Sequence, residues 1–369
     1  MNATPHGCDS PRPLTLPQLG WTSEHADAFA KYSGPYTAGR VACRQKTVWD
    51  VLTESGMVTT GITGALRKLG RFPAVGDFVV LLSQPGTGVS AIVDILPQRT
   101  RFSRGAAGKE CTDQVIAANI DTVFIVTAAG PDLNARRIER YLALVHASGA
   151  RPLIVINKAD LAEDPGGLAS AILPSSGQVP IVTLSALSGD GMARLDPYLA
   201  PGTTIALVGS SGVGKSTLIN RLLGGTVQDM AETREYDDRG RHTTTVRQLF
   251  VLRGGALMID NPGIREVGIG TASEGIADTF PDILELAGNC RFSDCRHDQE
   301  PGCAVTAAVR SGKLPALRLE NYRRLMKELA FGQEKAEIGL VRAERKRWKQ
   351  YNGHEAEKIR RAKEGKGMF

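Results

Sequence analysis

The chain has 369 residues, of which 42% are hydrophobic, 23% are charged and only 5% are aromatic. These fractions lie near globular averages, which argues against a disordered chain, a collagen-like fibre or a coiled coil. At roughly 150 residues per domain, the length predicts two or three packed domains.

The apolar runs of the sequence are short. None approaches the roughly 20 residues that a membrane helix needs, and the best runs, 123–126 and 153–156, have the length of strands. Residues 1–13 also lack the basic start and apolar stretch of a secretory signal. We therefore expect a cytoplasmic protein with no membrane association and with a frayed amino terminus.

The net charge of +6 is concentrated at the carboxyl terminus. Residues 341–369 contain ten Lys and Arg residues against four Glu residues, so this segment carries the whole positive surplus. A basic terminal block is typical of a segment that binds a polyanion, and RNA is the most common polyanion of the cytoplasm. The alternative interpretation is a solvated tail that only aids solubility.

Five short β-rich runs lie between residues 37 and 96, at 40–43, 47–53, 57–60, 77–82 and 90–95. This pattern predicts a small barrel, for which an OB-fold over 35–100 is the leading interpretation. Residues 1–34 would be an amino-terminal extension, and the Gly- and Ala-rich stretch 101–112 would be a linker. Basic residues occur in the later loops and suggest RNA binding, with ordinary surface charge as the alternative: Arg67, Lys68, Arg71, Arg99, Arg101 and Arg104.

The period of the hydrophobic pattern changes after the linker. Apolar runs at 122–127, 153–156, 181–184 and 205–208 alternate with helix-like segments such as 134–147. Alternating strands and helices predict a parallel, doubly wound α/β domain, which we place at 113–281. No strand pattern follows, so residues 282–369 are expected to form a helical domain with a basic tail.

The strongest motif is G-x-x-x-x-G-K-S, which lies between the apolar run 205–208 and the helix-like segment 218–223. Its glycines allow backbone N–H groups to surround phosphate oxygens at the positive end of a helix. Lys215 is expected to neutralise the β- and γ-phosphates, and the Ser216 hydroxyl to bind Mg²⁺. The predicted phosphate-binding residues are Gly209, Ser210, Ser211, Gly212, Val213, Gly214, Lys215, Ser216 and Thr217.

A second motif, N-K-A-D at 157–160, follows the apolar run 153–156. The Asp160 carboxylate can accept hydrogen bonds from both N1–H and the N2 amine of guanine, and adenine offers no such pair. Asn157 would connect the base loop to the phosphate loop, and the Lys158 stem would lie over the purine. Alone, this motif could be an ordinary turn. Ser185 and Ala186 follow the next strand, where the Ala186 N–H would bind guanine O6.

The D-x-x-G motif at 260–263 follows an apolar run at 256–259, although it is also a good plain turn. Asp260 would hold Mg²⁺ through water, and the Gly263 N–H would contact the γ-phosphate. In the polar segment before it, Thr244 is the expected switch ligand of Mg²⁺, with a register uncertainty of one residue among three consecutive threonines.

The residue after this motif is Ile264, where many G proteins have a Gln that orients the attacking water. Ile264 cannot form a hydrogen bond, so intrinsic hydrolysis should be slow. His242 is the nearest candidate to orient or deprotonate the water. The alternative is a His that is merely hydrogen-bonded within its loop.

A Cys/His cluster lies at Cys290, Cys295, His297 and Cys303. Three thiolates and one imidazole make a closed tetrahedral Zn²⁺ site of the structural kind. Disulfides are improbable in a reducing cytoplasm, which favours the metal. The remaining cysteines are scattered and carry no predicted role.

The base-reading motif precedes the phosphate loop, which is the reverse of the usual order and implies a circularly permuted GTPase domain. Together with the barrel and the zinc cluster, this order resembles the ribosome small subunit-dependent GTPase family (RsgA, also called YjeQ) over roughly residues 35–330. One departure is Asn261, where Thr or Ser is more usual.

The resemblance implies a GTPase that assists late maturation of the small ribosomal subunit. Hydrolysis of GTP to GDP would need Mg²⁺, be stimulated by the subunit and be linked to release of the protein. Its partners would be the subunit and its rRNA, and we expect a monomer. Two alternatives remain: a P-loop ATPase or kinase, and a nucleotide-switched RNA-binding module with little relevant turnover.

Overall fold

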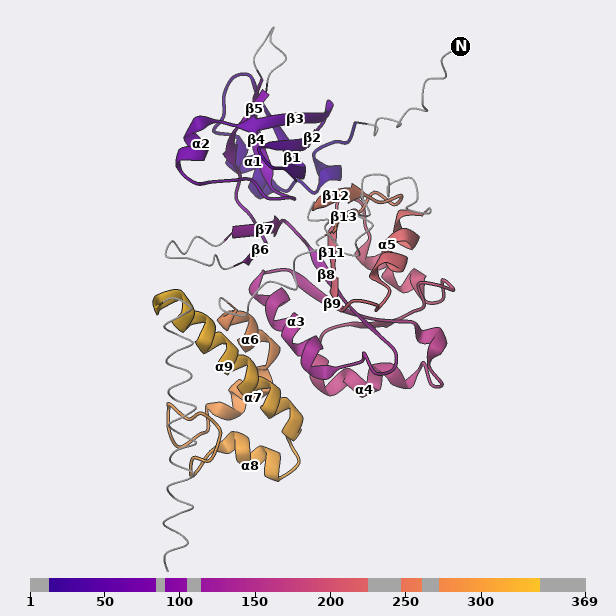
Figure 1. The fold of residues 1–369 in the computed structure, drawn as a ribbon, viewed down its shortest axis with the longest axis vertical. Coiled ribbons are helices and arrows are strands. Elements are labelled where there is room, and N and C mark those ends of the chain that lie inside the picture. The colour runs from indigo at the N-terminus through magenta and orange to yellow at the C-terminus, as the bar shows by residue number, and fades with distance from the viewer. Residues whose placement is uncertain (1–12, 84–89, 105–113, 225–246, 261–271, 339–369) are drawn as a thin grey trace, which may run out of the picture. The chain divides into compact units, whose positions relative to one another are not determined.

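The computed structural model describes residues 13–83, 90–104, 114–224, 247–260 and 272–338 (Figure 1). The chain divides into two compact units, one made of 1–103 with 115–267 and the other of 104–114 with 268–369. Over the described ranges, every helix is too short or too polar to span a bilayer.

The first unit contains a closed barrel of five strands (Figure 1). Strand β1 pairs with both β2 and β4, and β5 joins β3 to β4, so the strands return on themselves. The barrel is closed around a core that includes Val41, Trp49 and Val79. This confirms the OB-like barrel expected from the sequence. The strands are β1 (Tyr36–Gln45), β2 (Val48–Thr53), β3 (Gly56–Ile62), β4 (Phe78–Ser83) and β5 (Ser90–Ile95).

Two short helices precede the barrel, η1 (Pro17–Leu19) and α1 (Ser23–Phe29). The rings of Trp21 and His25 lie 5.1 and 4.3 Å from the ring of Phe78, measured between centroids. These aromatic contacts attach residues 17–29 to β4, whereas residues 1–12, which include nearly all of the segment expected to be frayed, lie outside the described residues.

Helix α2 (Gly64–Lys68) connects β3 to β4. After the barrel, β6 (Arg101–Arg104) pairs with β7 (Gln114–Ala118) in a separate two-stranded sheet. The first four residues of the stretch predicted as a linker thus form a strand, and the rest of it lies outside the described residues.

The α/β sheet of the first unit has the order β10-β9-β8-β11-β13-β12. All neighbours are parallel except β12, which is antiparallel to β13. The strands are β8 (Thr122–Ala128), β9 (Arg151–Asn157), β10 (Ile181–Thr183), β11 (Thr204–Gly209), β12 (Gln248–Val251) and β13 (Leu257–Asp260). Because strand pairing does not depend on chain order, the carboxyl ends of β9 and β11 still meet at one edge, where such sheets bind ligands.

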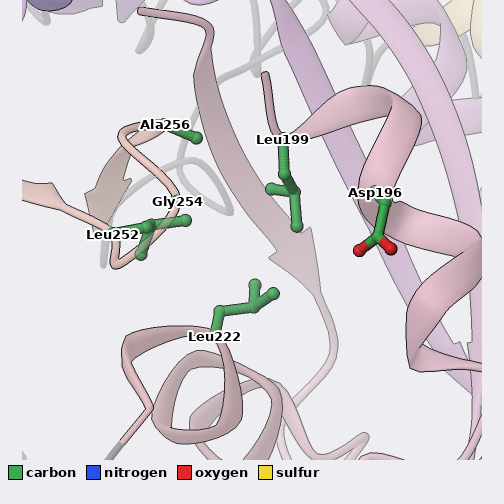
Figure 2. Close-up of a pocket in the computed structure, with 6 residues that line it drawn as sticks. All are labelled: Asp196, Leu199, Leu222, Leu252, Gly254 and Ala256. Atoms are coloured by element: carbon green, nitrogen blue, oxygen red, sulfur yellow. The ribbon is translucent and has the colours of Figure 1, made fainter. Parts of the chain in front are cut away.

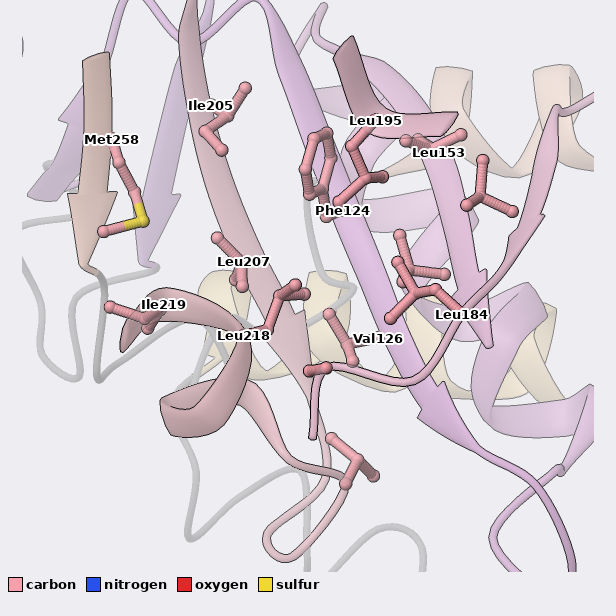
Figure 3. Close-up of a cluster of buried hydrophobic side chains, with 14 of the residues drawn as sticks. Phe124, Val126, Leu153, Leu184, Leu195, Ile205, Leu207, Leu218, Ile219 and Met258 are labelled. Carbon is pink, nitrogen blue, oxygen red and sulfur yellow. The ribbon is translucent and has the colours of Figure 1, made fainter. Parts of the chain in front are cut away.

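The sheet is buried because apolar side chains fill both of its faces. Every residue of β8 is buried, and Phe124, Leu153 and Leu207 belong to one core cluster with Leu218 of α5 (Figure 3). The connecting helices are α3 (Ala135–Ala147), η2 (Ala159–Leu161), α4 (Gly167–Ser176), η3 (Met192–Tyr198) and α5 (Lys215–Leu223). This core fixes the strand ends that carry the motifs.

The second unit is helical in its described part. It contains α6 (Ser273–Thr279), α7 (Pro281–Ala287), α8 (Ala304–Arg310) and α9 (Ala316–Ile338). The buried Arg318 of α9 donates to the carboxylate of Asp282 and to the carbonyl of Thr279, and it lies over the ring of Phe280. One guanidinium thereby connects α6, α7 and α9.

Candidate nucleotide and zinc sites

The phosphate loop connects the end of β11 to the start of α5. Lys215 Nζ donates to the carbonyl of Gly209 at 3.0 Å and to that of Ser210, so the loop curls around the ammonium group. Gly214 has φ +91°, and a Cβ at this position would lie 2.4 Å from Nδ2 of Asn157. A glycine is therefore required there, both for the backbone conformation and for the close approach.

Asn157 connects the base-reading motif to this loop. Its side chain is 2% exposed, and Nδ2 donates to the Val213 carbonyl at 2.9 Å. Its Oδ1 accepts from the backbone N–H of Ala186 at 2.9 Å. The three segments predicted from distant parts of the sequence thus converge. The Ala186 N–H, which we expected to bind guanine O6, is already engaged by Asn157.

Lys158 and Asp160 follow directly. Lys158 has φ 60°, an uncommon conformation for a residue with a side chain, and its turn starts η2. The Lys158 Cε lies 3.8 Å from the Cβ position of Gly214, so its stem extends along the phosphate loop. Asp160 lies exposed in η2, whereas Ser185 is buried and accepts from the Ser188 N–H.

The magnesium ligands predicted from the sequence are only partly described. Ser216 lies in the first turn of α5, and Asp260 ends β13, the strand that pairs with β11. Ser211, Gly212 and Thr217 lie in the same loop and helix start. Three further predicted residues lie outside the described residues: His242, Thr244 and Gly263.

Two arginines that sequence reasoning did not single out contact these loops. Arg137 of α3 donates to Ser210 Oγ at 2.5 Å and forms an ion pair with Asp132. Arg221 of α5 donates to the carbonyls of Ala186 and Leu187, at 3.2 and 2.7 Å. In the sequence, both look like ordinary charged residues on the outer face of a helix, so no local signal identifies them.

A cavity of about 290 Å³ lies beside α5 (Figure 2). Its lining is mostly aliphatic and comes from η3, α5 and the turn between β12 and β13: Asp196, Leu199, Leu222, Leu252, Gly254 and Ala256. None of the residues predicted to bind nucleotide lines it. It is therefore separate from the phosphate loop.

The Cys/His cluster gathers as the sequence predicts. The ligand atoms of Cys290, Cys295, His297 and Cys303 all lie within 4.8 Å of one another. His297 Nδ1 lies 3.6 Å from the Sγ atoms of both Cys290 and Cys303, and these two Sγ atoms are 3.9 Å apart. Around a tetrahedral Zn²⁺ with ordinary bond lengths, S···N is about 3.6 Å and S···S about 3.8 Å. The donor set therefore fits zinc in both chemistry and spacing.

The loop that carries these ligands has its own supports. The carboxylate of Glu300 accepts from the backbone N–H groups of Arg296 and Asp298, at 3.0 and 2.8 Å. Hydrogen bonds from backbone N–H groups, its own among them, lower the pKa of Glu300 to about 2. Cys303 Sγ accepts from the Thr306 N–H at 3.4 Å, which attaches the ligand to the start of α8.

Residues 95–270 match the model of the RsgA GTPase family. The chain is 56% identical to the small ribosomal subunit biogenesis GTPase RsgA of Methanosarcina acetivorans over 331 residues, which cover 90% of each chain. It is 45% identical to the protein of the same name from Opitutus terrae over 358 residues, which cover 93% of this chain and 98% of that one.

Two solved structures are also similar. YjeQ from Thermotoga maritima is 28% identical with a TM-score of 0.61, covering 80% of this chain and 99% of that one. YloQ, described as a circularly permuted GTPase, is 26% identical with a TM-score of 0.59, covering 80% of this chain and 95% of that one. With this identity over nearly all of its length, and with the N-K-A-D and G-x-x-x-x-G-K-S segments joined through Asn157 in permuted order, the chain belongs to the RsgA GTPase family.

Proposed function

We propose that this GTPase acts in late maturation of the small ribosomal subunit, that the subunit stimulates its hydrolysis of GTP, and that hydrolysis is coupled to release of the protein. The main observation in support of the nucleotide site is the pair of hydrogen bonds that the Asn157 side chain makes, one to the Val213 carbonyl and one to the Ala186 N–H. It places the base-reading loop beside the phosphate loop despite their reversed order. The role on the subunit is supported by the names of the relatives.

Different described residues bind the phosphates, the guanine base and Mg²⁺ in this proposal. Backbone N–H groups of 209–216 and the Lys215 ammonium bind the phosphates, and Asp160 reads the Watson–Crick edge of guanine. Ser216 and Asp260 would hold Mg²⁺, which supplies positive charge at the β- and γ-phosphate oxygens. Catalysis is then positioning and charge neutralisation without a covalent intermediate.

The switch residues complete the proposal. Thr244 would join the magnesium ligands, the Gly263 N–H would contact the γ-phosphate, and His242 would orient the attacking water. Because Ile264 cannot do so, hydrolysis without the subunit should be slow.

The zinc cluster has a structural role in this proposal. The four ligands Cys290, Cys295, His297 and Cys303 would leave no open position on the metal, which excludes a metal-bound water. The imidazole of His297 lies 6.3 Å from the ring of Tyr322, measured between centroids, so the cluster also adjoins α9. Zinc would therefore hold the 290–303 loop in place beside α8 and α9.

The rRNA contacts are assigned to the basic regions. Arg67 and Lys68 are exposed on α2, and the exposed Phe72 follows them on the barrel. A basic surface that includes an aromatic ring suits a nucleic acid, because the ring can stack on bases while the cations contact phosphates. We propose that the barrel and the basic tail both contact rRNA, and that the protein acts as a monomer in the cytoplasm.

The decisive experiment measures GTP turnover with and without purified small subunits, with large subunits as the control. We expect stimulation by small subunits only, and its loss in Lys215→Ala. ATP should compete poorly with GTP, and Asp160→Ala should abolish that preference. Equal competition by ATP would favour the ATPase or kinase alternative. GTP binding with no stimulated turnover would favour the RNA-binding module.

A further inference from the structure

The loop of residues 185–190, which follows β10, is held by side chains from two other elements. Asn157, at the end of β9, accepts from the Ala186 N–H, and Arg221, in α5, donates to the carbonyls of Ala186 and Leu187. Both polar backbone groups of Ala186 are therefore hydrogen-bonded to side chains, the N–H to Asn157 of the N-K-A-D motif and the carbonyl to Arg221 of the helix that follows the phosphate loop.

The loop also satisfies most of its own donors. Ser185 N donates to the Asp190 carbonyl at 2.9 Å, and Gly189 N donates to the Ser185 carbonyl at 2.9 Å. The N–H groups of Ser188 and Asp190 donate to the hydroxyls of Ser185 and Ser188, each at 3.2 Å. Among the residues that the structure describes, no acceptor takes the N–H of Leu187.

The N–H of Leu187 belongs to the same peptide group as the Ala186 carbonyl, which accepts a hydrogen bond from Arg221. The carbonyl of Ala186 and the N–H of Leu187 belong to one planar trans peptide, so they point in opposite directions. A guanidinium on the carbonyl turns the N–H away from α5. Hydrogen bonds in a chain also polarise one another, which strengthens the N–H as a donor.

The Arg221 guanidinium is closely packed at this place. Gly189 has φ +96°, and a Cβ added there would lie 3.1 Å from Arg221 Nη2. Arg221 is also six residues after Lys215 on the same helix, or roughly 9 Å along the axis. One rigid helix thus carries the phosphate-binding ammonium at its start and the support of the base loop near its end.

We propose that Arg221 is a positioning residue for guanine recognition, and that the donor it orients toward guanine O6 is the backbone N–H of Leu187. This inference rests on the proposed GTP site and adds to it a specificity determinant. Although the Ala186 N–H is bonded to Asn157, the Leu187 N–H of the same loop remains as a donor for guanine O6.

The test measures affinities of the full chain by displacement of a fluorescent GDP analogue. The competitors are GDP, IDP, which lacks the N2 amine, and 6-thio-GDP, in which a weakly accepting sulfur replaces O6. We expect Arg221→Ala to weaken GDP and IDP alike by about fivefold to tenfold, the value of roughly one hydrogen bond. The 6-thio-GDP affinity should change little, so the preference for GDP over 6-thio-GDP shrinks.

Three further variants distinguish the proposed positioning role of Arg221 from a general disruption of the nucleotide site. Arg221→Lys keeps one donor and should give an intermediate preference. Asp160→Ala should reduce the preference for GDP over IDP and leave the preference over 6-thio-GDP in place. Arg194→Ala removes a nearby arginine that donates to the Thr183 carbonyl outside the loop, and it should bind all three nucleotides like wild type.

The outcomes are distinct. Equal weakening of all three nucleotides by Arg221→Ala, or no weakening, would overturn the inference and leave the GTP site intact. A wild-type protein that binds GDP no better than ADP would overturn the proposed GTP site as well.

Discussion

Arg40 of the barrel strand β1 donates from Nη1 to Oγ1 of Thr204 at 2.8 Å, and Thr204 is the first residue of the strand that ends in the phosphate loop. The guanidinium is fully buried and also donates to three carbonyls, those of Leu19, Gly76 and Asn119. One side chain therefore connects the amino-terminal segment, the barrel and the α/β sheet.

Replacement of Arg40 by Met should destabilise the first unit by about 3 kcal/mol or more, because the buried acceptors of Leu19, Thr204 and Asn119 then lose the guanidinium, and the Gly76 carbonyl keeps only the side-chain amide of Asn119 as a donor. Burial lowers the pKa of Arg40 to about 10, so the group remains charged at neutral pH. Urea unfolding measures the change, with Arg67→Met on the exposed surface of α2 as a control that should stay within about 0.5 kcal/mol. A loss below about 1 kcal/mol for Arg40→Met would contradict the prediction.

The buried His25 should make the fold sensitive to acid. Burial, together with the guanidinium groups of Arg99 and Arg40, lowers its pKa from 6.5 to about 4. Between these values the unfolded chain binds the extra proton, so stability is full above pH 6.5 and falls toward pH 4. His25→Gln keeps an acceptor for the Thr22 N–H, as in a capping box, and should remove this loss. The measurement is the difference in unfolding free energy between variant and wild type against pH.

The buried Asp77 should change the unfolding free energy with pH in the opposite direction to His25. Burial raises its pKa from 3.8 to about 6, so the stability it contributes is present below pH 3.8 and is lost as the pH rises through 6. Wild type should therefore lose stability relative to Asp77→Asn over this interval. Parallel pH profiles for Asp77→Asn and wild type would show that the carboxyl titrates normally.

Purified protein should contain an equimolar amount of zinc, and Cys303→Ser should lose it. Structural zinc contributes about 10 kcal/mol or more of binding free energy in small domains, so the second unit should unfold without the ion. Cys43→Ser is the matched control, since Cys43 is buried in the barrel away from the cluster. Elemental analysis and proteolysis of the 272–338 region report the two effects. Retention of full zinc by Cys303→Ser would exclude Cys303 as a ligand.

Arg137 and Ser210 should act as a pair on the phosphate loop. Ser210→Ala and Arg137→Met should each weaken GTP, with the larger loss, about tenfold, in Arg137→Met, because the Asp132 carboxylate then remains unpaired beside the loop. Since both variants break the same hydrogen bond, the double variant should be weaker by less than the product of the single effects. Fully multiplicative losses in GTP affinity would mean that the two side chains act independently.

The sequence alone predicted the architecture because the relevant signals are local. Each strand of the barrel and of the α/β sheet is an apolar or alternating run of its own. The phosphate loop is a block of consecutive residues, so its composition indicates its conformation. The zinc ligands lie within a span of 14 residues, from Cys290 to Cys303, and their chemistry restricts the metal. The reversed order of the motifs was sufficient to predict the permutation.

Only the tertiary structure decided which side chains support these motifs. Arg40 meets a partner 164 residues away, Arg137 one 73 residues away and Arg221 two that are 34 and 35 residues away. Such contacts depend on how helices and strands pack, and the sequence around an arginine does not indicate which distant group will accept its hydrogen bonds. The same reason explains why no local signal identifies His25, in the predicted amino-terminal extension, as a residue buried against Phe78.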